Sequence, residues 1–393
     1  MDEKLPKVTI LGAGLSGLSF AYHYPGQSII YEKSDKIGGT ASTENYEGFF
    51  FDHGPHVSFT KDNYVRDLLE KNTKVVYKIA KPMNIMKGME FPHPALFHLN
   101  RLPKEERYKI LKDYVEAYRN YSAKSNPRNY GEWCEINQGK YFAGYYTESY
   151  TKKFWQNSSE NLTTEWTNVR IPIPSIDDAI KGVVGLNNKS GYYFNEYWYP
   201  KKGGFGSFSY FWIKRKRDIQ IHLGKEVKII NPSKKVIGFR DGSEQEYFKL
   251  GSTIPIPELS NILIDIPRDI RNSISKLETT SLHYINLGLK GKWKRKFSWL
   301  YFYDEDIPVT RMIPMNNIGP NMSPDGSTSL QIEIPYTKRF ENKLAHISLE
   351  KLMKLNYLRD SDIYKMWEFD LEYGYPIYNK DRGENLKLKW QRI

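Results

Sequence analysis

The feature that most constrains the fold is a glycine-rich turn near the N-terminus with the spacing G-x-G-x-x-G. Its residues are Gly12, Ala13, Gly14, Leu15, Ser16 and Gly17. An apolar run at 7–11 before the turn predicts a short buried strand, and the turn opens a helix predicted over 15–24. A second strand is predicted over 27–32. This order is a βαβ unit of the usual size.

Each conserved position of such a turn has a physical role in binding a dinucleotide. Gly12 allows the tight turn, Gly14 lets the backbone approach a pyrophosphate, and Gly17 lets the helix pack closely on the strand. The helix N-terminus offers unpaired N–H groups and partial positive charge to the phosphates. Glu32 ends the second strand, where it can accept hydrogen bonds from ribose hydroxyls and would repel the 2′-phosphate of NADP. A glycine-rich turn without a ligand remains the alternative.

The residues that follow favour FAD over a nicotinamide cofactor. Lys33 comes directly after the acid, and Gly38, Gly39 and Thr40 follow shortly afterwards. A glycine pair at this spacing lets the chain run back over a bound dinucleotide, which a plain nicotinamide domain does not need. Further on, the sequence FDHGPH at 51–56 contains two histidines, which we interpret as loop or flavin-side residues. No metal site is predicted.

The stretch 8–59 resembles the FAD-binding start of the amine-oxidase and protoporphyrinogen-oxidase superfamily. The shared order is strand, G-x-G-x-x-G, acid and base, glycine pair, and a D-x-G-x-H-like segment. Weaker likenesses are YPKKGGFGS at 199–207 and STIPIP at 252–257. The resemblance implies FAD as the cofactor, and it implies a set of binding residues. These are Gly12, Ala13, Gly14, Leu15, Ser16, Gly17, Glu32, Lys33, Gly38, Gly39, Thr40, His56 and Val227.

The later half is most similar to the UDP-galactopyranose-mutase-like branch of that superfamily. The similar segments are YTKKFW at 150–155, WTNVR at 166–170 and the stretch 299–311. The resemblance implies that Arg311 lies near the flavin within reach of a substrate phosphate, which a guanidinium can bind through two hydrogen bonds. Arg170, a poorer match, would assist it. The implied pocket-lining aromatic residues are Trp155, Tyr301 and Tyr303. The alternatives are surface ion pairs for the two arginines and core packing for the aromatic residues.

The 393-residue chain is too long for one ordinary core and has no repeat or low-complexity linker. We therefore expect an α/β fold in which a Rossmann-like FAD-binding domain is interleaved with a mixed helical and antiparallel-sheet substrate domain. The expected segments are FAD-binding at 1–80 and 199–268, a helical substrate region at 81–198, a substrate-domain sheet at 269–355, and a return to the FAD-binding domain at 356–393.

That last segment departs from the superfamily pattern. In the superfamily, a "YP.Y" turn precedes a glycine-rich segment that closes over the flavin. Here YPIY at 375–378 is followed by no such segment before Ile393. We therefore expect a truncated return to the FAD-binding domain, in which the fold is kept while FAD affinity and turnover are in question.

Composition limits the partners and the compartment. The net charge of +12 is spread along the chain without a nucleic-acid recognition motif, so we predict no nucleic-acid partner. An anionic small molecule or peripheral contact with a membrane surface fits the charge better. The single Cys134, an N-terminus unlike a signal peptide, and the lack of a long apolar run indicate a cytoplasmic protein. The oligomeric state is not predicted.

Three functions remain open at this stage. The first is an FAD-dependent oxidoreductase, acting on a small molecule in surface polysaccharide or related biosynthesis. The second is a non-redox mutase, or isomerase, acting on a nucleotide sugar. The third is a non-catalytic, truncated flavin-fold protein. No hydrolytic triad or carboxylate pair stands out, as expected where a cofactor carries the chemistry.

Overall fold

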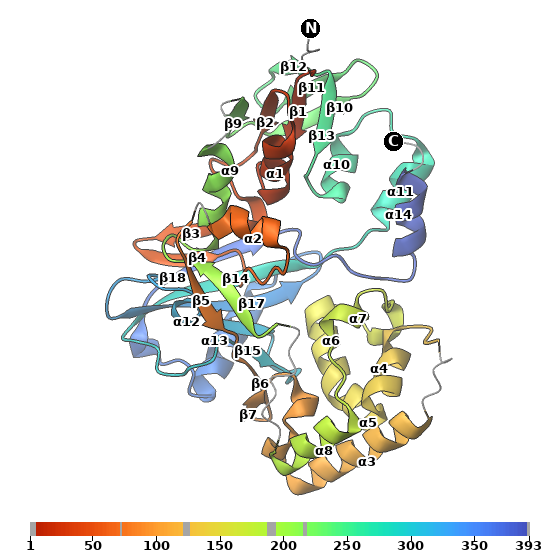
Figure 1. Ribbon diagram of the computed structural model, residues 1–393, viewed down its shortest axis with the longest axis vertical. Coiled ribbons are helices and arrows are strands. Elements are labelled where there is room, and N and C mark those ends of the chain that lie inside the picture. The colour runs from red at the N-terminus through yellow and green to blue at the C-terminus, as the bar shows by residue number, and fades with distance from the viewer. Residues whose placement is uncertain (1–4, 71–72, 121–125, 187–193, 215–217, 391–393) are drawn as a thin grey trace.

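The computed structural model describes residues 5–70, 73–120, 126–186, 194–214 and 218–390. A parallel sheet with its helices lies at the top of Figure 1, a large sheet lies in the middle, and a group of helices lies below and to the right. The glycine-rich turn belongs to the parallel sheet. Among the described residues, no helix is both long enough and apolar enough to cross a membrane.

The parallel sheet is a four-stranded Rossmann-like sheet in the order β13-β1-β2-β9. Its strands are β1 (Val8–Leu11), β2 (Ser28–Tyr31), β9 (Ile219–His222) and β13 (Lys249–Ser252). Helix α1 (Leu15–His23) joins β1 to β2, as the βαβ prediction requires. The two inner strands are buried along their whole length because helices and a second small sheet cover the two faces.

That small sheet is a three-stranded antiparallel meander between β9 and β13. Its strands are β10 (Val227–Asn231), β11 (Val236–Phe239) and β12 (Glu244–Glu246). Apolar side chains of β10 and β11 pack with Leu11, Ile29 and Tyr31 of the Rossmann-like sheet in one core cluster. One face of the Rossmann-like sheet is therefore covered by residues that come more than two hundred positions after the glycine turn.

The large sheet has seven strands in the order β18-β14-β17-β16-β15-β6-β7. They are β6 (Pro82–Met86), β7 (Met89–Pro92), β14 (Ser281–Lys290), β15 (Trp299–Phe302), β16 (Arg311–Pro314), β17 (Ser327–Tyr336) and β18 (Ile363–Leu371). All neighbours are antiparallel except β15 and β6. Helix α13 (Asn342–Lys354) contributes Ala345 and Leu352 to the core against this sheet.

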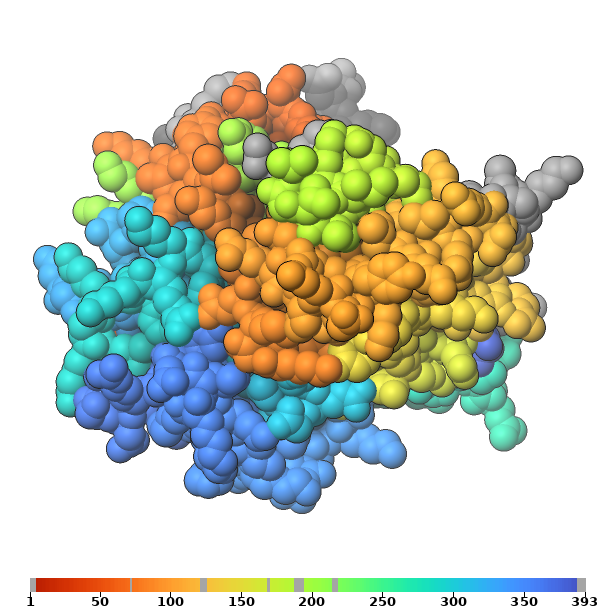
Figure 2. Space-filling view, turned by 90° about the horizontal axis from the view of Figure 1, so that it is seen from below, coloured from red at the N-terminus to blue at the C-terminus, as the bar shows by residue number. Residues whose placement is uncertain are grey.

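The helical region comprises α3 (Lys104–Asn120), α4 (Tyr130–Gln138), α5 (Lys140–Phe142), α6 (Glu148–Trp155), α7 (Thr167–Arg170) and α8 (Ile176–Val184). The side chain of Asn129 accepts a hydrogen bond from the N–H of Glu132 and so caps α4. Figure 2 shows this region, in orange to yellow-green, packed against the C-terminal part of the chain, in cyan and blue, which contains most strands of the large sheet.

Shorter elements connect these parts. They are the hairpin β3 (Thr43–Tyr46) and β4 (Phe49–Asp52), the pair β5 (Val75–Ile79) and β8 (Glu196–Pro200), and helices α2 (Asn63–Glu70), α9 (Phe211–Lys214), α10 (Ile256–Ile262), α11 (Arg268–Ser275), α12 (Met315–Ile318) and α14 (Arg382–Trp390).

The expected α/β fold with two interleaved parts is what the structure has. Two segments sit differently from their expected place. Strands β6 and β7, within the segment 81–198, join the large sheet through the pairing of β6 with β15. Strand β18, within 356–393, is the edge strand of the large sheet beside β14 and so does not return to the parallel sheet. Helix α14, which follows it in the same segment, packs against α11. Both differences arise from pairings between distant segments, which local sequence patterns do not encode.

Candidate functional site

The glycine turn has the geometry that its sequence predicts. Gly12 has a φ of 96°, and its N–H donates a 2.9 Å hydrogen bond to the carbonyl of Tyr31. A Cβ on Gly17 would lie 2.0 Å from the carbonyl oxygen of Gly12, so only glycine allows this close packing of α1 on the turn. The turn is thus fixed between β1 and β2, where the first turn of α1 begins.

The glycine pair Gly38 and Gly39 lies against the glycine turn at 12–17. The N–H of Gly38 donates a 2.9 Å hydrogen bond to the carbonyl of Ala13, and a Cβ on Gly39 would lie 3.0 Å from the Cα of Gly14. No side chain caps the N-terminus of α1 at Gly14. Its first N–H groups, including those of Leu15 and Ser16, have no intrahelical partner. This glycine-lined cradle fits a pyrophosphate.

Glu32 is aimed at the same turn. Its side chain is buried, Oε2 accepts a 2.7 Å hydrogen bond from the N–H of Ala13, and Oε1 accepts one of 2.9 Å from the N–H of Ser34. The N–H of Lys225 donates to the carbonyl of Glu32 at 2.8 Å, which places the start of β10 at Val227 close by. The ammonium of Lys33 is exposed and forms a 3.0 Å salt bridge with Glu258 of α10.

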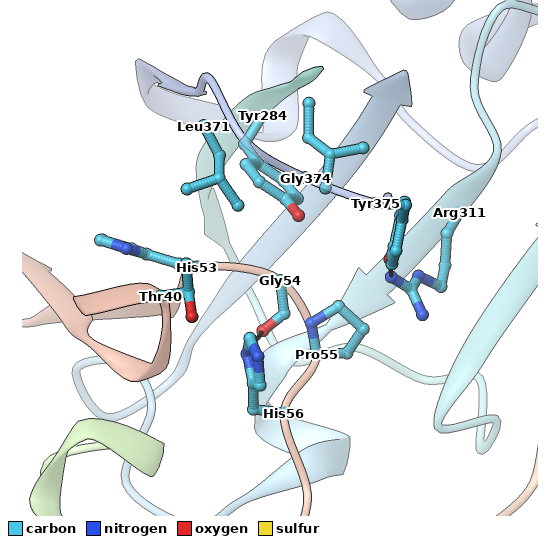
Figure 3. A pocket seen from close by; sticks show the side chains of 11 residues that line it. Thr40, His53, Gly54, Pro55, His56, Tyr284, Arg311, Leu371, Gly374 and Tyr375 are labelled. Atoms are coloured by element: carbon cyan, nitrogen blue, oxygen red, sulfur yellow. Dashed lines mark hydrogen bonds between the residues drawn. The ribbon is translucent and has the colours of Figure 1, made fainter. Parts of the chain in front are cut away.

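A cavity of about 230 Å³ lies between the FAD-binding part and the large sheet. It is lined by Thr40, His53, Gly54, Pro55, His56, Leu282, Tyr284, Arg311, Leu371, Gly374 and Tyr375 (Figure 3). Thr40 comes shortly before the β3–β4 hairpin, and the next four residues come from the segment directly after it. The remaining six come from the large sheet and from the segment that follows β18. Both parts of the fold therefore contribute walls to one cavity.

Two histidines lie on the hairpin side of the cavity. The Nδ1 of His56 lies 3.1 Å from the carbonyl of Gly54, and burial lowers the pKa of His56, which favours a neutral ring. The Nε2 of His53 lies 2.7 Å from Oε1 of Glu44. This hydrogen bond is the main cause that lowers the pKa of Glu44 to about 2. His53 therefore has an ionised carboxylate beside it at neutral pH.

Arg311 lies on the opposite side of the cavity, where Figure 3 shows its guanidinium beside the ring of Tyr375. Its Nη2 donates to Oε2 of Glu333 at 2.6 Å and to the hydroxyl of Tyr375 at 2.9 Å. Burial acts to lower the pKa of Arg311, but the charge of Glu333 outweighs it and holds the pKa well above its ordinary value. The alternative of a surface ion pair is wrong, because Glu333 is fully buried and Arg311 largely so.

The ion pair leaves one donor of the guanidinium without a partner among the described residues. Oε2 of Glu333 also accepts from the hydroxyl of Tyr284 at 3.1 Å, and Oε1 accepts from Thr310 at 3.2 Å, so the carboxylate is fully engaged. By contrast, the buried Nε of Arg311 has no hydrogen-bond partner among the described residues. An unpaired donor of a charged group beside a cavity suits an anionic ligand.

The predicted aromatic residues are arranged around Arg311 rather than in the cavity wall. Tyr301 is the strand partner of Arg311, and its ring meets Tyr150 edge-on at a centroid distance of 5.8 Å. Tyr303 is buried against Tyr150 at 5.2 Å. Trp155 is buried in an aromatic cluster, 6.3 Å from the ring of Tyr375.

Arg170, the second predicted arginine, is exposed on α7 and does not line the cavity. Of the predicted residues, the structure therefore brings Thr40, His56 and Arg311 together at one cavity. Tyr301, Tyr303 and Trp155 are not among the residues that line the cavity, and the last two are packed in the core, as the core-packing alternative describes.

Asp52, the acid of the D-x-G-x-H-like segment, received no role in the sequence analysis, yet it organises the hairpin side of the site. Oδ1 of Asp52 accepts hydrogen bonds from the hydroxyl of Thr43 at 2.6 Å and the N–H of Phe205 at 3.0 Å, and Oδ2 accepts from Tyr199 at 2.5 Å. A Cβ on Gly204, whose φ is 67°, would lie 2.8 Å from Oδ1. Asp52 thus ties the YPKKGGFGS turn to the segment 53–56.

Glu333 and Tyr284 were also missed, although the sequence holds a signal for them. Glu333 is the one acid in the apolar stretch LQIEIPY, and a lone acid in a strand buried on both faces requires a buried partner. Tyr284 lies opposite it across the β14–β17 pair. The partner of the acid, Arg311, comes from the next strand, and only the sheet order reveals that.

Residues 10–71 match the family described as an NAD(P)-binding Rossmann-like domain. An L-amino-acid oxidase of Crotalus adamanteus is 26% identical over 201 residues, which are 48% of this chain and 34% of that protein. The chain therefore spans about a third of the length of the curated relatives that it matches.

Solved structures match over nearly the whole chain. Reduced UDP-galactopyranose mutase has a TM-score of 0.90 and 23% identity, over 98% of this chain and 87% of the other. An Exiguobacterium sp. protein assigned as a protoporphyrinogen oxidase has a TM-score of 0.73 and 16% identity, over 99% and 90%. These comparisons confirm the expected resemblance to the FAD-dependent amine-oxidase-like superfamily and its fold.

Proposed function

We propose that this chain, which has the fold of the FAD-dependent amine-oxidase-like superfamily, is an FAD-dependent oxidoreductase. In this proposal the pyrophosphate lies on the glycine turn, the adenosine ribose binds Glu32, and the ring system enters the cavity beside His56. FAD supplies the redox chemistry when it is bound. The protein residues hold it, exclude water and orient the substrate.

One observation carries the proposal. Residues 38–40 touch the glycine turn at one end, through Gly38 and Gly39, and line the cavity at the other, through Thr40. A ligand that joins a diphosphate to a ring system would follow this segment from the Rossmann-like sheet to the large sheet. A plain nucleotide site would need no cavity at the far end of the segment.

The substrate side of the cavity favours an anionic small molecule. Arg311 is held charged by Glu333 while its Nε has no partner among the described residues. Tyr375 and Tyr284 add hydroxyl groups to the same wall. A substrate carboxylate or phosphate that accepts a hydrogen bond from Arg311 would be oriented against the ring system on the His56 side.

The test is the absorbance of the purified protein and its response to substrate. We expect visible flavin bands, after reconstitution with FAD if needed, and oxygen uptake with an amine, amino-acid or porphyrinogen substrate. A colourless protein that cannot be reconstituted would contradict the proposal and favour a non-catalytic flavin-fold protein.

A second candidate is a non-redox isomerase that acts on a nucleotide sugar. Arg311 favours it, because a buried guanidinium with a free donor suits a diphosphate better than a neutral amine. The discriminating experiment adds dithionite and UDP-galactose to the flavin-loaded protein. Product formed only with reduced flavin, and without net oxidation, would support the isomerase and exclude the oxidase. Turnover that consumes oxygen would do the reverse.

A further inference from the structure

A buried lysine holds the loop that leads to Arg311. Lys153 lies on α6 of the helical region, and the residue is only 8% exposed. Its ammonium donates hydrogen bonds to four backbone carbonyls, those of Phe302, of Asp304 at 2.9 Å, and of Ile307 and Val309 at 3.2 Å each. These carbonyls come from one loop, residues 302–309, which we call the carbonyl cage.

Burial lowers the pKa of Lys153 to about 7, and the charges of the three acids in the loop act against that shift, while the hydrogen bonds of the ammonium go to carbonyl groups. The loop contains three acids, yet each side chain is engaged elsewhere. Asp304 accepts from the N–H of Lys87, Glu305 accepts from the hydroxyl of Ser149, and Asp306 pairs with Lys351. A neutral amine has two N–H donors and a lone pair that would face one of the carbonyls. The ammonium form fits the cage better, because it has no lone pair and its three donors serve the four carbonyls when one N–H is shared between two of them.

The loop connects the cage directly to the cavity. Thr310 follows Val309, and its N–H donates a 3.0 Å hydrogen bond to the carbonyl of Glu333. Its hydroxyl donates to Oε1 of the same residue at 3.2 Å. Arg311 comes next and pairs with Oε2. Arg311, at the start of β16, therefore comes two residues after a loop that folds around a cation from another region of the chain.

We propose that Lys153 is a positioning residue, whose ammonium acts as an internal cation that folds the carbonyl cage and so sets Arg311 between Glu333 and the cavity. This inference rests on the proposed function for the importance of Arg311. The folding of the cage itself stands independently of any substrate.

The test uses Lys153→Ala, which leaves four carbonyl oxygens around an empty space that a small cation can enter. In unliganded protein we expect amide hydrogen exchange over 303–311 to accelerate by about tenfold or more, the effect of losing a charged hydrogen bond. We expect phenylglyoxal to modify Arg311 faster, as mapped by mass spectrometry. Methylammonium should slow both the amide exchange over 303–311 and the modification of Arg311. Tetramethylammonium, which has no N–H donor, should slow neither.

Two further variants serve as controls. Lys153→Met fills the space without a donor, so it should fold, lose protection over 303–311, and fail to respond to methylammonium. Lys152→Met removes the neighbouring lysine, whose ammonium is exposed 4.0 Å from Glu148, and should leave protection unchanged. Wild-type protection over 303–311 in both Lys153 variants, or lost protection that methylammonium does not restore in Lys153→Ala, would overturn the inference.

The site is tested separately by the affinity of wild-type and Lys153→Ala protein for UDP. Weaker binding by Lys153→Ala that methylammonium restores would support the positioning role. Wild-type protein that binds neither UDP nor substrate would contradict the proposed function of Arg311, whereas the exchange measurements would still decide whether Lys153 folds the cage.

Discussion

Oε2 of Glu32 accepts a 2.7 Å hydrogen bond from the backbone N–H of Ala13, so the acid at the end of β2 is already turned toward the glycine turn after β1. In the proposed site, the carboxylate of Glu32 therefore needs no rearrangement to face the adenosine ribose. A site that is organised before its ligand arrives loses less conformational freedom on binding. The first two predictions follow from this geometry.

Gly14→Val should keep the fold and abolish FAD binding. A Cβ at Gly14 would meet its nearest neighbours, Gly39 Cα and Gly38 O, only at ordinary contact distances of 3.8 and 3.9 Å, so the free protein can accommodate a side chain. The side chain would instead occupy the path of the pyrophosphate. Flavin content and circular dichroism measure the two effects. Gly17→Val should lose both the fold and FAD binding, because its Cβ would lie 2.0 Å from the carbonyl oxygen of Gly12. Stoichiometric flavin in Gly14→Val would refute this placement of the pyrophosphate.

Glu32→Gln should weaken FAD binding by roughly tenfold to a hundredfold, because it replaces charged hydrogen bonds and sets an amide against the N–H of Ala13 or Ser34. The dissociation constant can be measured from the change in flavin fluorescence. Asp35→Asn makes the same change on the exposed turn that follows and should leave the constant unaltered. Equal affinities for the Glu32 variant and wild type would show that the acid does not contact the ribose.

Arg311→Met should destabilise the protein as well as raise the KM for an anionic substrate. Its removal leaves Glu333 buried without a counter-charge, which costs about 3–5 kcal/mol. Adding Glu333→Gln removes that charge, so the double variant should recover most of the free energy of unfolding while KM stays high. Denaturant unfolding and steady-state kinetics separate the two. Recovery of KM in the double variant would assign Arg311 a structural role only.

Asp52 should make stability fall as the pH rises from about 4 to 6. Burial raises its pKa from 3.8 to about 6, so the folded state holds a proton that the unfolded state has already released in this window. The stabilising contribution is complete below pH 4 and is lost as pH passes 6. A difference of roughly two pKa units corresponds to about 3 kcal/mol. Asp52→Asn does not titrate, so the difference in unfolding free energy between it and wild type should change by about this amount. A constant difference between pH 4 and 7 would show that Asp52 is ionised throughout.

The sequence was most informative where the contacts join residues that lie close together in the chain. The glycine turn, helix α1 and the acid at the end of β2 lie within one βαβ unit, and the spacing of their residues reflects contacts between near neighbours. Thr40 and His56, which the resemblance implies as cofactor-binding residues, follow that unit closely in the chain and both line the cavity. For such residues, the motif and the geometry carry the same information.

The rest of the site depends on contacts between distant segments. Arg311 finds Glu333 because β16 pairs with β17, and Lys153 reaches its carbonyl cage from another region altogether. The resembling segments contain residues of the types expected in a substrate pocket, namely Trp155, Tyr303 and Arg170. In the structure the two aromatic residues lie in the core and the arginine lies on the surface. Residue type alone does not distinguish a ring behind a cavity from a ring in its wall.

The order of strands in the Rossmann-like sheet has a consequence for biosynthesis. Strand β1, which carries the glycine turn, lies between β2 and β13, so one of its edges stays uncovered until residue 252 has left the ribosome. The helical region is translated before that point. Stable capture of a dinucleotide therefore becomes a late event on the nascent chain, and the unpaired edge of β1 must be kept from other chains in the meantime.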